Sequence, residues 1–204
     1  MQTTDKPMSD STSKREQILQ AALTVFSTHG YRETRVDGVA KEAGVAKGTI
    51  YLYFESKEDM YLEVFRENVE KLHQAHVDAV RDKASVWDKI RALVAVSLEF
   101  AEKHEKFLRI YLTEYGRFTG RPEFAKRLQE SLEKGRALSR RLFEEGIEAG
   151  EVRQAPVEQL ILMLNYSITG MMARRLTDIR RANEPELTPD QIVELLREGL
   201  RARH

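Results

Sequence analysis

Hydrophobic side chains recur along the 204-residue chain at intervals of three to four positions, which is the spacing of one face of an α-helix. No segment alternates between apolar and polar residues as a half-buried strand does. The pattern therefore predicts an all-α fold of about nine helices. The first is expected to begin at Ser13, which forms a capping box with Glu16, and to end at Gly30, because glycine accepts the positive φ of a helix terminus.

Two short helices follow, in a helix-turn-helix arrangement. Thr34 is expected to cap the earlier helix and Gly44 to supply the turn, and the later helix is expected to run from Lys47 to Phe54. At about 100° per residue, Ile50 and Phe54 point into the core. The opposite side of the later helix carries Gly48, Thr49, Leu52 and Tyr53, with Tyr51 on its flank.

Capping residues and helix breakers divide the remainder of the chain into six further helices. They are expected to begin at or near Ser56, Ser85, Glu105, Pro122, Pro156 and Thr188. The longest is preceded by a loop over 116–121 and is expected to end within 146–150. The stretch 159–173 carries no charged side chain over 15 residues, which is too short to span a bilayer and is typical of a buried helix.

The chain thus divides into a polar tail over 1–12, expected to be disordered, a three-helix unit over 13–58 and a larger helical domain over 59–204. Lys plus Arg and Asp plus Glu both number 33, so the formal net charge is zero. This argues against an RNA-coat or nucleoid-type protein, which binds nucleic acid through an overall positive charge. Residues 14–57 hold seven basic and five acidic residues, a weak local excess. The absence of cysteine excludes disulfides and thiol chemistry, and no signal peptide opens the chain, so a cytoplasmic location is expected.

The open side of the later short helix suits contact with double-stranded DNA, because a helix-turn-helix lays its second helix in the major groove. Gly48 lets the backbone approach the duplex closely. Lys47 and Lys57 can pair with phosphates, as can the hydroxyl groups of Thr49, Tyr51 and Tyr53.

Two side chains of this region are candidates for contact with bases as well as with the DNA backbone. Tyr51 and Leu52 can pack on thymine methyl groups, and Arg35 is the best candidate for a hydrogen bond to guanine or to the adjacent backbone. The alternative is a generic three-helix core in which the tyrosines are half-buried.

A longer motif makes the pattern specific. It reads Phe26-x-x-x-Gly30-Tyr31, then Thr34-Arg35-Val36, then Val39-Ala40-x-x-Ala43-Gly44-Val45-Ala46-Lys47-Gly48-Thr49-Ile50-Tyr51-x-Tyr53-Phe54-x-Ser56-Lys57-Glu58. Over about residues 13–60 this motif closely resembles the TetR (tetracycline-repressor-like) family of transcriptional regulators, and the helical remainder resembles the family in outline. The resemblance implies a homodimeric repressor with a DNA-binding domain over 13–58 and a ligand-binding and dimerisation domain over 59–204.

The same resemblance implies that operator DNA is touched by Lys47, Gly48, Thr49, Tyr51, Tyr53 and Lys57. With Thr34, Arg35, Ala46 and Leu52 added, the predicted DNA-contacting set has ten members. Position 46 is often serine in the family, where it caps the helix and touches phosphate, so Ala46 removes one hydroxyl group. Leu52 stands where a polar or aromatic residue is common, which argues against hydrogen-bond readout at that position.

A small-molecule site is implied by the resemblance, and aromatic residues with polar tips suggest where it lies. The predicted lining residues are Phe100, His104, Phe107, Tyr111, Tyr115, Phe118, Leu142, Met163 and Tyr166. They suit a mainly apolar cavity with a few hydrogen-bonding groups, and hence an apolar or amphipathic effector. The alternative is that these aromatic residues are plain core.

A dimer interface is also implied, because the last two helices of each subunit form a four-helix interface in the resembled family. The predicted interface residues are Leu160, Leu164, Ile168, Met171, Met172, Ile192, Leu195, Leu196 and Leu200. Two-fold symmetry also suits a palindromic operator. The alternative is that the helix after Pro156 is the central core helix of a monomer.

Metal, cofactor and catalytic sites are not expected. Glu70 and His73 give one Glu-x-x-His motif and His76 follows, whereas a di-iron bundle needs that motif twice with two further glutamates. A zinc site would lack a third ligand near these two histidines, which are expected to be solvated or to line a pocket. No phosphate loop, nucleophile elbow or paired-carboxylate motif occurs.

Three functions remain open. The preferred one is an effector-released repressor, acting as a homodimer on double-stranded operator DNA. The second is a DNA-bound regulator without a small-molecule effector, whose larger domain recruits a protein partner. The third, a helical-bundle enzyme, would require turnover or bound metal for which no motif provides.

Overall fold

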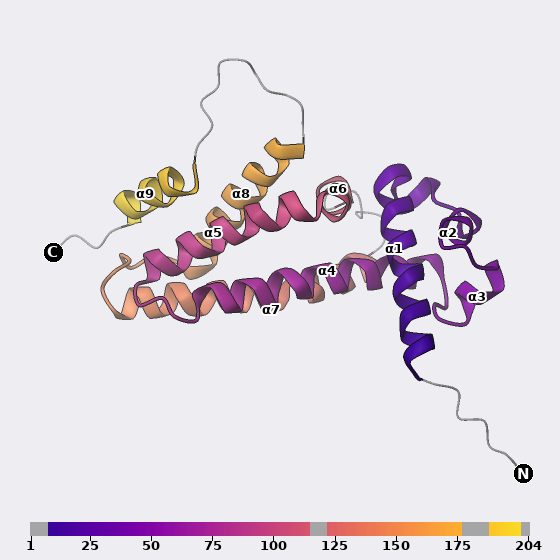
Figure 1. The fold of residues 1–204 in the computed structure, drawn as a ribbon. Coiled ribbons are helices and arrows are strands. Elements are labelled where there is room, and N and C mark those ends of the chain that lie inside the picture. The colour runs from indigo at the N-terminus through magenta and orange to yellow at the C-terminus, as the bar shows by residue number, and fades with distance from the viewer. Residues whose placement is uncertain (1–7, 115–121, 177–187, 201–204) are drawn as a thin grey trace, which may run out of the picture.

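The computed structural model describes residues 8–114, 122–176 and 188–200, and Figure 1 shows their arrangement. Regular structure within these ranges is helical, as the apolar periodicity predicts, and includes no strand. The helices are α1 (Met8–Glu33), α2 (Val36–Glu42), α3 (Lys47–Tyr51), α4 (Lys57–Val80), α5 (Val86–Lys103), α6 (Glu105–Glu114), α7 (Pro122–Glu148), α8 (Val157–Leu176) and α9 (Pro189–Leu200).

The helices form two groups that share one long element (Figure 1). Helices α1, α2 and α3 gather at one end of the molecule, and α4 runs from that end along the body. Helices α7 and α5 pack along α4, α8 packs on α5 and α7, and α9 lies on α5 at the far end. No helix of the described ranges is long and apolar enough to cross a bilayer.

The start of α1 differs from the prediction. The helix begins at Met8 rather than at a capping box of Ser13 and Glu16, so residues 8–12 of the expected disordered tail are helical. The reason is that no proline or glycine lies between Met8 and Gly30, and nothing in that stretch stops the helix from extending. At Gly30 the backbone leaves helical geometry with φ 75° and ψ 168°, as expected for a glycine terminus.

The predicted caps of three later helices are confirmed. The hydroxyl of Ser56 accepts from the amide of Asp59 at 3.0 Å, and that of Ser85 accepts from the amide of Asp88 at 3.1 Å. Before α9, the amide of Gln191 donates to the Thr188 hydroxyl at 3.2 Å, and the amide of Thr188 donates to the Gln191 side chain at 2.9 Å. Pro122 is the first residue of α7, as proline at a helix start allows.

One apolar core is continuous across the predicted boundary at 58/59, which falls at the start of α4. An aromatic cluster joins the two groups: Phe26 and Tyr31 from α1, Tyr61 from α4 and Phe124 from α7. The ring centroids of Phe124 and Tyr61 are 5.6 Å apart, as are those of Phe124 and Tyr31. The three-helix unit is therefore packed onto the start of the larger domain by close aromatic contacts.

The crossing of α5 and α7 depends on the absence of a side chain at Gly146. A Cβ atom there would lie 2.9 Å from one methyl of Val86 and 3.0 Å from a methyl of Val152, which are stiff β-branched side chains. We expect Gly146→Ala to lower the free energy of unfolding by ~1–3 kcal/mol. Thermal denaturation tests this against Gly135→Ala on the same helix, where the new methyl group meets no atom within 4 Å. Equal melting temperatures of Gly146→Ala and the wild type would contradict the close contact.

Candidate DNA interface and effector cavity

The helix-turn-helix is built by a sharp turn and two anchoring side chains. Gly44 provides the turn with φ 62°, a conformation that favours glycine. Helix α3 spans five residues and ends at Tyr51, so the expected helix as far as Phe54 is too long. The side chain of Phe54 nevertheless points inward, because the backbone makes one further turn after Tyr51. In this turn the amides of Tyr53 and Phe54 both donate to the carbonyl of Ile50 at 3.0 Å. Ile50 and Phe54 are buried at 1% and 3% exposure.

The opposite side of α3 is open to solvent. Tyr51 is 49% exposed and Leu52 is 81% exposed, although large apolar side chains are usually covered. No atom lies within 4 Å of the position that a Cβ would take at Gly48, so the helix backbone itself is approachable there. Ala46 precedes α3 with an extended backbone and makes no side-chain cap, as expected for an alanine in place of serine. Thr49 is half-buried beside this open side.

Lys47 lies at the edge of the same surface, in an exposed ion pair. Its ammonium is 3.0 Å from a carboxylate oxygen of Asp37 on α2. This hydrogen bond and the charge of Asp37 raise the pKa of Lys47, so it carries its positive charge at neutral pH. Exposed ion pairs are weak, and the ammonium is therefore available to exchange Asp37 for a phosphate.

Three predicted DNA contacts are placed differently by the structure. Tyr53 is half-buried against the core of the three-helix unit rather than on the open side. Thr34 is 3% exposed and its hydroxyl donates to the Gly30 carbonyl at 2.7 Å, so it does not cap α2. The residue at the N-cap position of α2 is Arg35, which is exposed and makes no side-chain cap.

Lys57 is the third predicted DNA contact, after Tyr53 and Thr34, that the structure places differently. Its ammonium donates to the carbonyls of Tyr31 at 2.8 Å, Arg32 at 3.3 Å and Thr34 at 2.9 Å. It also lies 4.5 Å from the centroid of the Tyr31 ring. A cation is favoured at this place because carbonyls at the end of a helix lack helical partners. Lys57 therefore fixes the end of α1 to the start of α4, with its ammonium directed at three backbone carbonyls.

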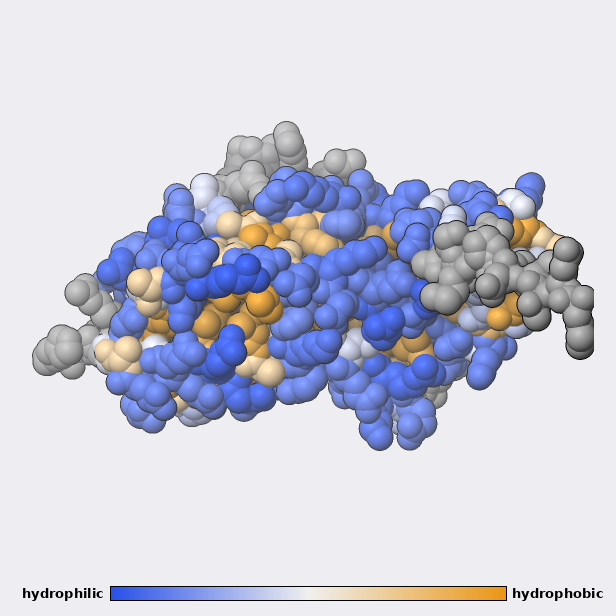
Figure 2. Space-filling model, turned by 60° about the horizontal axis from the view of Figure 1, so that its bottom comes forward, coloured by the Kyte–Doolittle hydropathy of each residue, from blue (hydrophilic) through white to orange (hydrophobic). Residues whose placement is uncertain are grey.

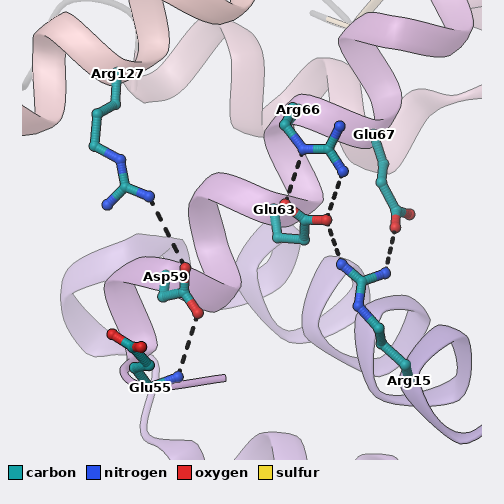
Figure 3. Close-up of polar contacts among 7 residues, drawn as sticks. All are labelled: Arg15, Glu55, Asp59, Glu63, Arg66, Glu67 and Arg127. Atoms are coloured by element: carbon teal, nitrogen blue, oxygen red, sulfur yellow. Dashed lines mark hydrogen bonds and ion pairs between the residues drawn. The ribbon is translucent and has the colours of Figure 1, made fainter. Parts of the chain in front are cut away.

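Ion pairs also tie α1 to α4 (Figure 3). Arg15 on α1 bonds Glu67 at 2.9 Å and also bonds Glu63, which Arg66 contacts at 2.6 Å. The bonds from Arg66 and Arg15 lower the pKa of Glu63, against its partial burial. The first three turns of α4 are thus held to the DNA-binding unit by charge as well as by packing.

The body of the larger domain contains a cavity of about 280 Å³ between α4, α5, α6, α7 and α8. Of the residues predicted to line a ligand site, Phe107, Tyr111 and Tyr166 do so. The other lining residues are Val69, Leu72, His73, His76, Leu93, Ser97, Leu132, Gly135, Arg136, Leu138, Ser139, Leu162, Leu164, Asn165, Ile168, Thr169 and Met172. The wall is mainly apolar, and each of the five helices contributes at least one side chain with a polar group to it.

Four predicted lining residues lie elsewhere. Phe100 and His104 stack on each other with ring centroids 4.0 Å apart and do not line the cavity. Leu142 is 2% exposed within the core, and Met163 packs half-buried against the core formed by α5, α7 and α8. Tyr115 and Phe118 lie outside the described residues. Helical spacing alone did not separate the face toward the cavity from the neighbouring faces.

Two histidines of α4 supply polar groups to the cavity, as the pocket-lining alternative for His73 and His76 allowed. His76 Nε2 is 2.8 Å from the Ser97 hydroxyl, whose proton goes to the Leu93 carbonyl at 2.7 Å. Nε2 must therefore carry a proton and donate it to Ser97. Burial lowers the pKa of His76 to about 4, so the ring is neutral at pH 7. No group of three or more potential metal ligands occurs in the described parts of the chain.

The predicted dimer residues divide into a buried and an accessible set. Leu160, Leu164 and Met172 are 4%, 1% and 5% exposed in the chain's own core, so they are not free to meet a partner. Helix α8 is not buried all round, because it exposes Leu162 at 43% and Tyr166 at 67%.

On α9, Leu195 is 66% exposed, and the side chain of Leu200 lies outside the described residues. The remaining members of the predicted set are half-buried: Ile168, Met171, Ile192 and Leu196. Figure 2 shows that apolar side chains also reach the surface in patches on one face of the end of the body away from α1–α3.

Comparison with known proteins places the chain in a family. The model of bacterial regulatory proteins of the tetR family matches residues 18–64, which cover the helix-turn-helix. The fatty acid metabolism regulator protein of Bacillus subtilis (strain 168) is 31% identical over 142 residues, covering 69% of this chain and 72% of the relative. The transcriptional repressor KstR2 of Mycobacterium tuberculosis is 30% identical over 141 residues, covering 69% of this chain and 70% of the relative.

A solved structure agrees over most of the length. The transcriptional regulator FadR from Bacillus subtilis, in complex with stearoyl-CoA, superposes with a TM-score of 0.80 at 25% identity, covering 91% of this chain and 98% of FadR. The superposition includes the larger domain, for which the sequence resembled the family only in outline. The chain belongs to the tetR family of bacterial regulatory proteins.

Proposed function

We propose that the protein is a homodimeric transcriptional repressor acting on DNA in the cytoplasm. Helix α3 of each subunit enters a major groove of a palindromic operator. A small apolar or amphipathic effector binds the cavity between α4 and α8 and releases the repressor from the operator. This proposal agrees with two relatives, since KstR2 is a transcriptional repressor and the Bacillus subtilis relative is a fatty acid metabolism regulator.

The observation that carries the proposal is the contrast between the two sides of α3. Ile50 and Phe54 are buried, whereas Tyr51 and Leu52 stand in solvent beside the open backbone at Gly48. A monomeric three-helix core would have no reason to expose these apolar side chains together with an uncovered helix backbone. A major groove about 12 Å wide admits a helix presented in this way.

The effector step is supported by the course of α4. Its first turns are fixed to α1 by Arg15 and Lys57, and its later turns carry His73 and His76 into the cavity wall. A ligand that prefers a shifted position of α4 would therefore also shift the DNA-binding unit. This is a population shift, in which the effector selects the state whose two α3 helices no longer match the operator.

The effector class is proposed as lipid-like. The FadR structure holds stearoyl-CoA, and the cavity of this chain has a mainly apolar wall. The experiment is selection of duplexes by the purified protein from a random pool, followed by release trials with a panel of acyl-CoAs. Palindromic selected sequences released by an acyl-CoA support the proposal. Persistent binding in the presence of every panel member favours the protein-partner alternative.

Substitutions on the open side of α3 are expected to weaken operator binding without unfolding the protein. Lys47→Ala should weaken binding to all duplexes and reduce the salt slope by about 1, because one phosphate contact is lost. Tyr51→Ala should weaken the selected duplex roughly ten-fold, the effect of a base contact of ~1–3 kcal/mol. Gel-shift titration measures both against Lys83→Ala, an exposed lysine beyond the far end of α4. Unchanged affinity in both α3 variants would refute this assignment of the DNA-contacting surface.

A further inference from the structure

Two buried polar atoms in the cavity wall lack hydrogen-bond partners. They are Nδ1 of His73 on α4 and Nε of Arg136 on α7. Buried polar groups are nearly always paired, so an unpaired one in a cavity wall requires a partner that enters the cavity, such as an ordered water, an ion or a ligand. Both atoms are able to carry a proton, so both can donate to an acceptor oxygen.

The two residues lie level with each other. Helices α4 and α7 run in the same direction, because Arg127 pairs with Asp59 at 3.9 Å and Lys134 pairs with Glu70 at 2.8 Å further along both helices. His73 follows Glu70 by three residues and Arg136 follows Lys134 by two, which are similar advances along the two helix axes. Since both side chains line the same cavity, they bound one region of it.

The charges around this region are already balanced. The guanidinium of Arg136 contacts Glu158 at 3.0 Å, and Glu158 also bonds Arg140 at 2.8 Å. Arg140 is in turn 3.6 Å from Glu133, so two cations face two carboxylates. His76 on the same wall is neutral. A carboxylate entering the cavity would find no arginine without a counter-charge, and burying an unpaired charge is strongly unfavourable.

The volume sets the size of the enclosed ligand. An apolar cavity of ~150 Å³ holds benzene, so about 280 Å³ holds roughly twice as many non-hydrogen atoms, on the order of twelve. Leu162 and Tyr166 are the exposed large apolar residues of the wall, which places the opening beside α8. Any larger part of a ligand would lie outside that opening, next to the α8 face on which we expect the partner subunit to pack.

We propose that the cavity binds a neutral, mainly apolar molecule with an enclosed part of about twelve non-hydrogen atoms and one carbonyl oxygen. The carbonyl oxygen accepts hydrogen bonds from Arg136 Nε and from His73 Nδ1. This inference rests on the proposed sensing of a small molecule and names the chemistry of that molecule. A ketone, an ester and a thioester share this chemistry, whereas a free fatty acid does not.

Equilibrium dialysis of the full-length protein at pH 7 tests the inference with three probes: 2-undecanone, decanoate of matched size, and decanoyl-CoA. The ketone is expected to bind at least ten-fold tighter than decanoate. Tight binding of decanoyl-CoA would identify a thioester as an accepted source of the carbonyl, and its exclusion would restrict the site to smaller carbonyl compounds. Equal binding of ketone and carboxylate, or binding of neither, would overturn the inference.

Variants separate the hydrogen bonds from the packing. His73→Leu and Arg136→Met are each expected to weaken the ketone about ten-fold, whereas Arg141→Met, exposed on the same helix and outside the cavity wall, leaves it unchanged. Glu158→Gln keeps Arg136 but removes its counter-charge, so it should retain the ketone and tighten decanoate. Wild-type ketone affinity in both His73→Leu and Arg136→Met would refute the assigned donors.

These readouts do not involve DNA, and the two proposals can therefore fail separately. If decanoyl-CoA releases the selected operator while 2-undecanone does not bind, the carbonyl assignment is wrong and the repressor function stands. If the ketone binds as expected but no effector releases the operator, the cavity chemistry stands and the release mechanism is wrong.

Discussion

Replacing Phe124 with alanine is expected to lower the free energy of unfolding by about 3–5 kcal/mol, the usual cost of removing a buried phenyl ring. Phe124 is 1% exposed and packs against Tyr31 and Tyr61 with centroid distances of 5.6 Å to each. Chemical denaturation monitored by circular dichroism measures the loss.

The matched control for this prediction is Phe124→Leu, which keeps most of the apolar volume and should lose much less stability. The packing also predicts a second result. Because the cluster joins the DNA-binding unit to the larger domain, Phe124→Ala should loosen α1 and weaken operator binding although it touches no DNA. A stability loss below about 1 kcal/mol would show that the cluster does not hold the two groups together.

Charges placed on the outer faces of α8 and α9 are expected to separate the subunits. Among the side chains of these helices that the structure describes, Tyr166 and Leu195 are the most exposed large apolar ones, at 67% and 66%. In a two-fold interface each substitution occurs twice, so the double variant Tyr166→Glu with Leu195→Glu buries four unpaired carboxylates. A penalty of several kcal/mol corresponds to a rise in the dimer dissociation constant on the order of a thousand-fold.

Analytical ultracentrifugation measures this separation directly. The matched control carries Tyr166→Phe and Leu195→Met, which keep the apolar area and should leave the dimer intact. Operator affinity is expected to fall with dimerisation, because each monomer then reads only one half-site. A double glutamate variant that remains dimeric would move the interface away from these faces.

The parts of the fold set by neighbouring residues were predictable from the sequence. Ser56, Ser85 and the pair Thr188 and Gln191 satisfy orphan amides within their own helices, so their spacing was sufficient to locate the helix starts. Pro122 located the start of α7 for a similar local reason. Ser13 and Glu16 predicted the wrong start for α1, because a capping box has the same composition as an ordinary polar turn inside a helix.

Contacts between distant segments were not predictable in the same way. Lys57 turns toward the carbonyls at residues 31–34, which approach it only after Gly30 has redirected the chain. Thr34 is buried by the same change of direction. Both residues belong to the family motif, and the motif showed that they matter without showing whether they touch DNA or hold the domain together.

The cavity illustrates the limit most clearly. The sequence marked aromatic residues on α5 and α6, yet Phe100 and His104 stack beside the cavity while His73, Ser97 and Arg136 line it. Lining residues come from five helices, and their rotation about each axis is set by packing rather than by periodicity. The sequence did place Phe107, Tyr111 and Tyr166 in this wall, and it left His73 and His76 as candidates for lining a pocket.

The central claim is that two α3 helices, held by a symmetric dimer, read successive major grooves of one duplex. The most direct measurement is fluorescence anisotropy with the selected palindromic duplex and with a second duplex in which about five base pairs, half a helical turn, are inserted at the centre. The account predicts that the insertion weakens binding at least a hundred-fold, because it turns one half-site to the opposite side of the DNA. Equal affinity for the two duplexes would contradict it.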